Sequence, residues 1–204
     1  MISLFSLADK CDVKRYGSNY GNWTHMHIRE IDWRIDTLEY VVVGIDAGLA
    51  AIDTRIGNPE WYDGGHALDD VEPLLGLGLV AFQTYAAGTV SDLNQIRRSR
   101  GKTALTKRHC YNHDSAKVNG VVTRIQLINS AANYFKHHDE WDLWPTGKQI
   151  GAQDVKNLAL LGITQRTEHP CIKAVELLSG TSWKMIVVHQ IVREWRAYIF
   201  SELR

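Results

Sequence analysis

The stretch IREIDWRIDTLEYVVVGIDAGLAAIDTRI, residues 28–56, gives the clearest structural signal in the chain. Its aliphatic residues recur at alternating intervals of three and four, which is the period of one buried face on a helix. They are Ile28, Ile31, Ile35, Leu38, Val42, Ile45, Leu49, Ile52 and Ile56. Gly57, Asn58 and Pro59 follow, a combination that ends helices. The spacing therefore predicts one long helix over 28–56.

The segment YVVVGIDAG, residues 40–48, resembles the strand and glycine turn that open the nucleotide site of sugar kinases and actin. The helical period runs through this segment without interruption, and the chain is short for that two-lobed fold. We therefore interpret Gly44 and Gly48 as close-packing positions on the helix, and a nucleotide site is not favoured.

Apolar periods of the same kind predict five further helices. Their expected ranges are 69–98, 118–141, 153–161, 171–178 and 182–203. Asp69, Asp70 and Pro73 suit the start of the first of them. Residues 1–22 are expected to be an irregular N-terminal segment and 99–117 a long basic loop, and no strand is expected. The sequence predicts an all-α fold, a bundle of about four long helices plus short extra helices in a single domain, 1–204.

Composition excludes several classes of protein. The chain has 204 residues, 45% of them hydrophobic, and its 23 lysines and arginines balance 23 aspartates and glutamates. The formal net charge is zero, so overall charge does not attract the protein to nucleic acid or to a membrane surface. The N-terminus lacks a secretory pattern, and no apolar run is expected to reach the roughly 20 residues that span a bilayer. Three scattered cysteines suit a reducing compartment, so a cytoplasmic protein without membrane contact is expected.

The chemistry is concentrated on the predicted third helix, in ANYFKHHDEW, residues 132–141. On a helix, Asn129, Asn133 and His137 follow one another at intervals of four and share a face, and Lys136 flanks them. An imidazole that exchanges protons near neutral pH, a cation for phosphate oxygens and orienting amides are the parts that a metal-independent ribonuclease needs. Alternatively, the charged residues form a solvated helix end and the asparagines make polar contacts inside the bundle.

Two stretches, VAFQTYAAGTV (80–90) and ANYFKHHDEW, in an all-α bundle resemble the HEPN superfamily. The resemblance implies a metal-independent ribonuclease of a toxin, abortive-infection or CRISPR-linked system, with no cofactor and with a pocket completed across a homodimer. Its motif is an arginine, often a polar residue, and a histidine after four to six positions. Asn133 stands at the polar position and His137 or His138 at the histidine. Ala132 replaces the arginine, so Lys136 substitutes for it or the site is inactive.

A second match to this motif is RHCYNH, residues 108–113, in which Arg108 and His113 have the required spacing. It lies in the predicted loop over 99–117. This region is basic, because no acidic residue occurs between Asp92 and Asp114. The cations of this region are the candidate nucleic-acid-binding residues. They are Arg97, Arg98, Arg100, Lys102 and Lys107.

A zinc site is a further interpretation of the same segment. His109 and His113 have the spacing of a metal-binding pair on one helical turn, with Cys110 beside them. A fourth ligand would have to come from His169 or Cys171 through the fold, so we rank this interpretation lower and expect no metal.

Two functional hypotheses follow. The first is a HEPN-like effector that cleaves or binds RNA as a homodimer, under the control of a regulatory protein partner. Its catalytic residues are either Asn133, Lys136 and His137, or Arg108 and His113. The alternative is a non-catalytic helical interaction module, such as an antitoxin, an immunity protein or a scaffold subunit.

Overall fold

The structure is a computed structural model that describes residues 31–204, apart from 57, 59–61, 141–142 and 181. The described residues form seven α-helices, a short 3-10 helix and one antiparallel pair of strands, so the all-α prediction is confirmed. The helices are α1 (Ile35–Asp53), α2 (Gly64–Ser99), α3 (Lys107–Asn112), α4 (Arg124–His137), α5 (Ala152–Ala159), α6 (Pro170–Ser179) and α7 (Met185–Leu203). The remaining elements are β1 (Lys117–Val118), β2 (Val122–Thr123) and η5 (His138–Glu140). The predicted irregular segment 1–22 lies outside the described residues.

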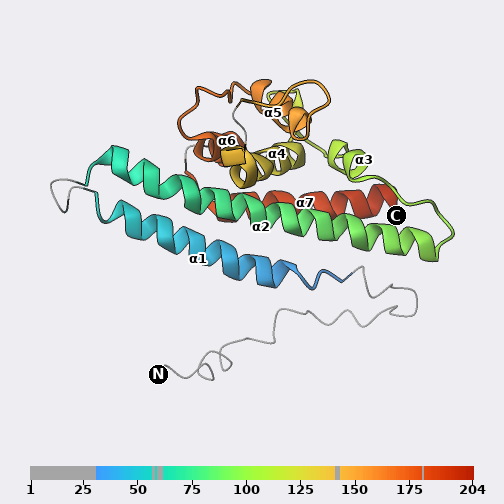
Figure 1. Ribbon diagram of the computed structural model, residues 1–204. Helices are drawn as coiled ribbons and strands as arrows, with labels where there is room; N and C mark the ends of the chain where they lie inside the picture. Colours follow the sequence, from blue (N-terminus) through green and yellow to red (C-terminus); the bar gives the residue numbers. More distant parts are fainter. Residues whose placement is uncertain (1–30, 57, 59–61, 141–142, 181) are drawn as a thin grey trace, which may run out of the picture.

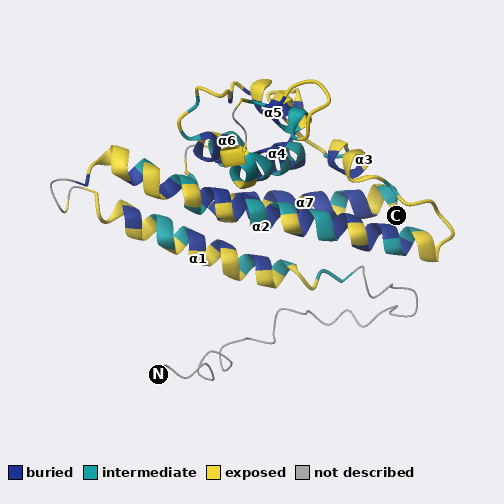
Figure 2. Ribbon diagram, in the orientation of Figure 1, coloured by how far each residue is buried: buried dark blue, intermediate teal, exposed yellow. Residues whose placement is uncertain are grey.

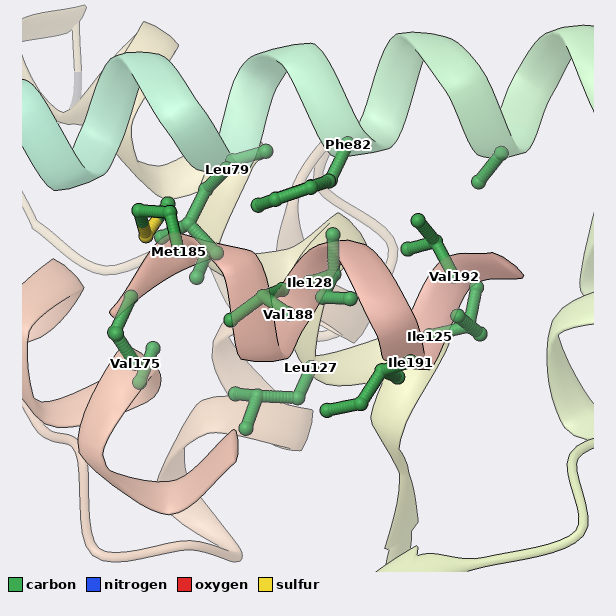
Figure 3. Close-up of a cluster of buried hydrophobic side chains, with 14 of the residues drawn as sticks. Leu79, Phe82, Ile125, Leu127, Ile128, Val175, Met185, Val188, Ile191 and Val192 are labelled. Atoms are coloured by element: carbon green, nitrogen blue, oxygen red, sulfur yellow. The ribbon is translucent and has the colours of Figure 1, made fainter. Parts of the chain in front are cut away.

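The central element is α2, which packs against α1, α4, α6 and α7. In Figure 1, α1 and α7 run alongside α2, whereas α4, α5 and α6 form a smaller layer on the side of α2 away from α1. Buried side chains from α2, α4, α6 and α7 meet between these layers (Figure 3). They include Leu79, Phe82, Ile125, Leu127, Ile128, Val175, Met185, Val188, Ile191 and Val192.

In the described residues α1 begins at Ile35, not at residue 28 as predicted. Leu38, Val42, Ile45 and Ile52 of the predicted face are buried. Residues 31–34 are not helical, and the side chains of Asp32 and Arg34 pair with residues of α7 and α2.

A buried ionic network joins that entering segment to the bundle. Arg196 of α7 is only 5% exposed, and its Nε lies 3.2 Å from Oδ2 of Asp32. Its Nη1 lies 3.6 Å from Oδ2 of Asp92 on α2, which also binds Arg34. The Tyr85 hydroxyl donates to Asp32, and burial together with this contact raises the pKa of Tyr85 above its ordinary value. The network therefore fixes where the chain enters α1.

The two glycines of α1 differ in their surroundings. A methyl group added at Gly48 would lie 3.2 Å from Cδ1 of Leu74, so its prediction as a close-packing position is confirmed. At Gly44 nothing lies within 4 Å, so the same prediction is wrong within the described protomer. Position 44 faces outward from the bundle.

The second helix begins at Gly64, five residues before the predicted start. Asp63 causes the difference because its side chain accepts hydrogen bonds from the backbone N–H groups of Gly65 and His66, which caps the helix. Pro73, which was expected close behind the first turn, consequently lies well inside the helix.

The predicted helix over 118–141 is wrong at its N-terminal end, where β1 and β2 form a hairpin. Asn119 and Gly120 both have positive φ, which makes the turn between the strands. Helix α4 starts only after Thr123, whose side chain and Gln126 form a capping box. The predicted loop over 99–117 also contains a helix, α3.

Carboxylates from neighbouring helices cap α6 and α7. Glu72 of α2 accepts from the backbone N–H groups of Cys171 at 2.8 Å and Ile172 at 2.9 Å. Asp46 of α1 accepts from that of Met185 at 2.8 Å, so α7 begins three residues after its predicted start.

Against the sequence expectation, one described helix, α2, is long and apolar enough to cross a membrane by length and composition alone. Half of its apolar window is buried by the rest of the bundle. One such helix is weak evidence for a membrane span, because the core helix of a soluble protein meets the same criteria.

Candidate functional site

A polar network joins α2, α4 and α5 through two asparagines of α4. Gln83 Nε2 donates to Oδ1 of Asn129 at 3.0 Å and to Oδ1 of Asn133 at 2.7 Å. On the other side, Asp154 accepts from Nδ2 of Asn129 at 3.1 Å and from Nδ2 of Asn133 at 2.9 Å. Each asparagine amide therefore bridges the glutamine of α2 and the carboxylate of α5, which fixes its orientation.

The network continues in both directions from this centre. Ser130 Oγ donates to Asp154 Oδ1 at 3.0 Å and accepts from Asn157 Nδ2 at 3.0 Å. Lys136 Nζ donates to Gln83 Oε1 at 2.8 Å, and the lysine is exposed. Asp154 thus accepts from three side chains, and the ammonium of Lys136 has further hydrogens directed toward solvent.

The sequence predicted that Asn129 and Asn133 share a face of a helix, and this is confirmed. Their partners were not predicted. Gln83 lies in VAFQTYAAGTV, one of the two stretches that resemble the HEPN superfamily, but Asp154 does not. Its only signal was its place on the short amphipathic helix α5. The polar contacts inside the bundle, which were the alternative interpretation of the asparagines, are therefore present.

A cavity of about 910 Å³ lies beside this network. Asn133 and Asp154 form one wall together with His137, while Lys136 is not among the lining residues. The other lining residues are Glu140, Leu143, Trp144, Pro145, Thr146, Gln149, Ile150 and Gly151. The cavity thus combines an imidazole, two carboxylates, two amides and an aromatic ring.

His137 and Glu140 form a pair at the edge of this cavity. The Nδ1 atom of His137 lies 3.1 Å from Oε1 and 3.2 Å from Oε2 of Glu140. A carboxylate at Nδ1 orients the ring, so Nε2 is the nitrogen that a ligand in the cavity would meet. The side chain of His137 is 44% exposed, so a ligand in the cavity has access to it.

The neighbouring His138 is placed differently. Its Nδ1 lies 3.1 Å from the carbonyl oxygen of Phe135, and its ring stacks on Tyr134 with centroids 5.2 Å apart. It does not line the cavity. Ala132, which stands where the HEPN motif has arginine, is completely buried, so the wall has no charged side chain from this position.

The second motif candidate, Arg108 and His113, lies at the opposite end of α4. Arg108 is exposed on α3, and the ring of His113 stacks on Tyr198 with centroids 5.6 Å apart. α4 has 14 residues and therefore separates this segment from His137 by about 20 Å. The structure does not bring the two candidate sites together.

The basic residues of the predicted nucleic-acid-binding region have structural contacts. Arg97 donates to the carbonyl oxygens of Thr103 and Leu203, and Lys102 donates to that of Arg204 at 2.7 Å. Both cations therefore complement the C-terminus of α7. Arg98 donates to a carbonyl oxygen of its own helix, while Arg100 and Lys107 are exposed. This basic group lies far from the cavity beside His137.

The zinc interpretation finds no support in the part of the chain that the structure describes, where no three potential metal ligands form a group. His109 and His113 stack with their centroids 6.0 Å apart. Cys110 is buried, and burial raises the pKa of its thiol to about 11, which disfavours the thiolate that binds zinc.

Comparison of the chain with protein-family models, curated proteins and solved structures finds no match. The resemblance to the HEPN superfamily thus stays a prediction that rests on the residues themselves.

Proposed function

We propose that the cavity beside α4 and α5 is a metal-independent RNA-cleaving site in which His137 transfers the proton. The observation that supports this proposal is the His137–Glu140 pair at the edge of a cavity that Asn133 also lines. The proposal needs neither a metal nor a cofactor, since RNA supplies its own nucleophile.

In this mechanism Nε2 of His137 takes the proton of a ribose 2′-hydroxyl. The 2′-oxygen then attacks the adjacent phosphorus, and the bond from phosphorus to the 5′-oxygen breaks. The imidazolium returns its proton to the departing 5′-oxygen, which leaves a 2′,3′-cyclic phosphate and a 5′-hydroxyl. Glu140 stabilises the imidazolium, and Lys136, which lies outside the cavity wall, adds positive charge to this end of α4. The Asn133 amide, held by Gln83 and Asp154, is the orienting group.

The experiment is incubation of the full-length protein with tRNA and mRNA in EDTA, beside His137→Ala, His138→Ala and His113→Ala variants. We expect cleavage by the wild type, with a loss of about 10²- to 10⁴-fold in rate for His137→Ala alone. His138→Ala is the matched control, because that histidine is adjacent but does not line the cavity. Loss only in His113→Ala would move the site to α3, and intact RNA in every lane would reject the ribonuclease.

The second candidate is a non-catalytic interaction module that binds a regulatory or target protein. Three observations favour it. The Asn133 amide is bonded on both sides within the bundle, Glu140 and Asp154 give the cavity two carboxylates that repel phosphate, and Ala132 adds no cation. On this proposal the folded protein leaves RNA intact and forms a stoichiometric complex with one protein that survives size-exclusion chromatography.

A further inference from the structure

The side of α1 that faces away from the bundle is apolar. Between residues 40 and 51 seven residues are exposed, and none of them is charged. They are Tyr40, Val41, Val43, Gly44, Ala47, Ala50 and Ala51, and we call this surface the outer face of α1. Tyr40 is 71% and Val43 57% exposed. Figure 2 shows exposed residues along the side of α1 that faces away from α2.

This surface is unusual for a helix at the edge of a soluble bundle, whose outward residues are normally polar. The acidic residues of the same turns, Glu39 and Asp46, are half-buried, and Asp46 caps α7. Trp33, 69% exposed, lies two residues before α1 and adds another exposed apolar side chain near the start of that helix. Contiguous apolar patches of several hundred Å² usually mark an interaction surface.

The stripe is complementary to itself when two copies run antiparallel. In the register that places Gly44 opposite Ala47 of the second copy, Tyr40 lies opposite Ala51 of that copy. A large side chain then meets a small one on either side of the centre. Nothing lies within 4 Å of the outward position at Gly44, so two backbones can approach closely there.

The same register also pairs opposite charges at the two ends. Asp36, exposed in the first turn of α1, comes opposite Arg55 of the second copy. The Arg55 side chain is 53% exposed, although it lies 3.6 Å from Asp70 and over the ring of Tyr62. A two-fold axis forms every pair twice, as an isologous interface requires.

We propose that the outer face of α1 is the interface of a two-fold homodimer, in which α1 lies antiparallel to α1 of a second copy. The proposal is independent of the ribonuclease function, because α4 lies on the other side of α2 (Figure 1) and the cavity is lined by residues 133–154. Each protomer then keeps its own cavity accessible in the dimer, in contrast to the shared pocket that the HEPN resemblance implies.

The first test is the mass of the full-length protein by sedimentation or light scattering over a range of concentrations. We expect a dimer of the 23.1 kDa chain, and Ala47→Glu should raise the dissociation constant about 100-fold or more by placing a charge in the apolar centre. Leu160→Glu is the matched control, since that residue is 54% exposed just after α5 and should leave the dimer intact.

The second test fixes the register. Under mild oxidation a Tyr40→Cys/Ala51→Cys double variant should form a disulfide-linked dimer, while each single variant behaves like the wild type. A monomeric wild type at every concentration overturns the proposal, as does a dimer that Ala47→Glu leaves unchanged. Cross-linking of Tyr40→Cys alone overturns the antiparallel register. If the protein is a monomer and the thiol of a Tyr40→Cys variant does not react with maleimide, another part of the same chain covers the outer face of α1.

Discussion

The ring of Phe135 on α4 lies directly against the backbone of Gly76 on α2. A methyl group added at position 76 would fall 2.2 Å from Cδ2 of the ring, a separation that no real contact allows. Phe135 immediately precedes Lys136 and is two residues from His137. This contact therefore determines how closely the C-terminal end of α4, which carries the candidate site, packs against α2.

Gly76→Ala is consequently expected to destabilise the protein by about 1–3 kcal/mol, despite the better helix propensity of alanine. Urea unfolding followed by circular dichroism measures this change. Adding Phe135→Leu should recover part of the loss, because the smaller side chain leaves room for the methyl group. Strict additivity of the two substitutions would show that the ring does not cause the effect.

Asp154→Ala should destabilise the protein by about 2–3 kcal/mol, because it leaves the donors of Asn129, Ser130 and Asn133 without their acceptor. The loss is measured as a lower urea midpoint at an unchanged slope. Asp139→Ala, whose side chain is 92% exposed, is the control and should change stability by about 0.5 kcal/mol or less. Equal effects of the two substitutions would contradict a structural role for the network.

Thr123→Ala should cost about 1–2 kcal/mol. The threonine hydroxyl donates to the carbonyl oxygen of Tyr111 at 2.6 Å and accepts from the backbone N–H of Gln126 at 3.1 Å, so both contacts are lost. Thr123→Ser keeps the hydroxyl and should retain most of the stability in the same unfolding experiment. A serine variant as unstable as the alanine variant would assign the effect to the methyl group instead.

Stability should fall as pH rises above about 9. Burial raises the pKa of Cys110 from 9.0 to about 11 and that of Tyr111 from 10.0 to about 12. Between the unfolded and folded values the unfolded chain releases protons that the folded chain keeps, so alkali favours unfolding. Unfolding free energies at pH 8, 9, 10 and 11 test this expectation. A constant value across that range would contradict the burial of these groups.

The parts of the fold that depend on apolar period could be predicted from the sequence. The buried residues Leu38, Val42 and Ile45 of α1 were predicted because their spacing alone determines a helical face. The helix ends were predicted less well, because they depend on caps such as those of Asp63 and Thr123. A cap is decided by the conformation of two or three residues, and periodicity does not contain that information.

In the candidate site, too, only the features that depend on helical spacing could be predicted from the sequence. The common face of Asn129 and Asn133 follows from helical spacing within one segment. That Gln83 and Asp154 would bind them depends on which helices pack together, and no local pattern specifies this. In the same way, a run of cations suggests an anion-binding surface, but it does not reveal that Arg97 and Lys102 bind the carbonyl oxygens at the end of α7.

The length of α2 has a mechanical consequence. With 36 residues it is about 54 Å long, and α1 and α4 are both attached to this one rod, on different sides of it (Figure 1). While α2 stays folded, α1 and α4 can each move relative to it without moving the other. We expect the amide hydrogens in the middle of α2 to exchange with solvent most slowly, and only through unfolding of the whole bundle.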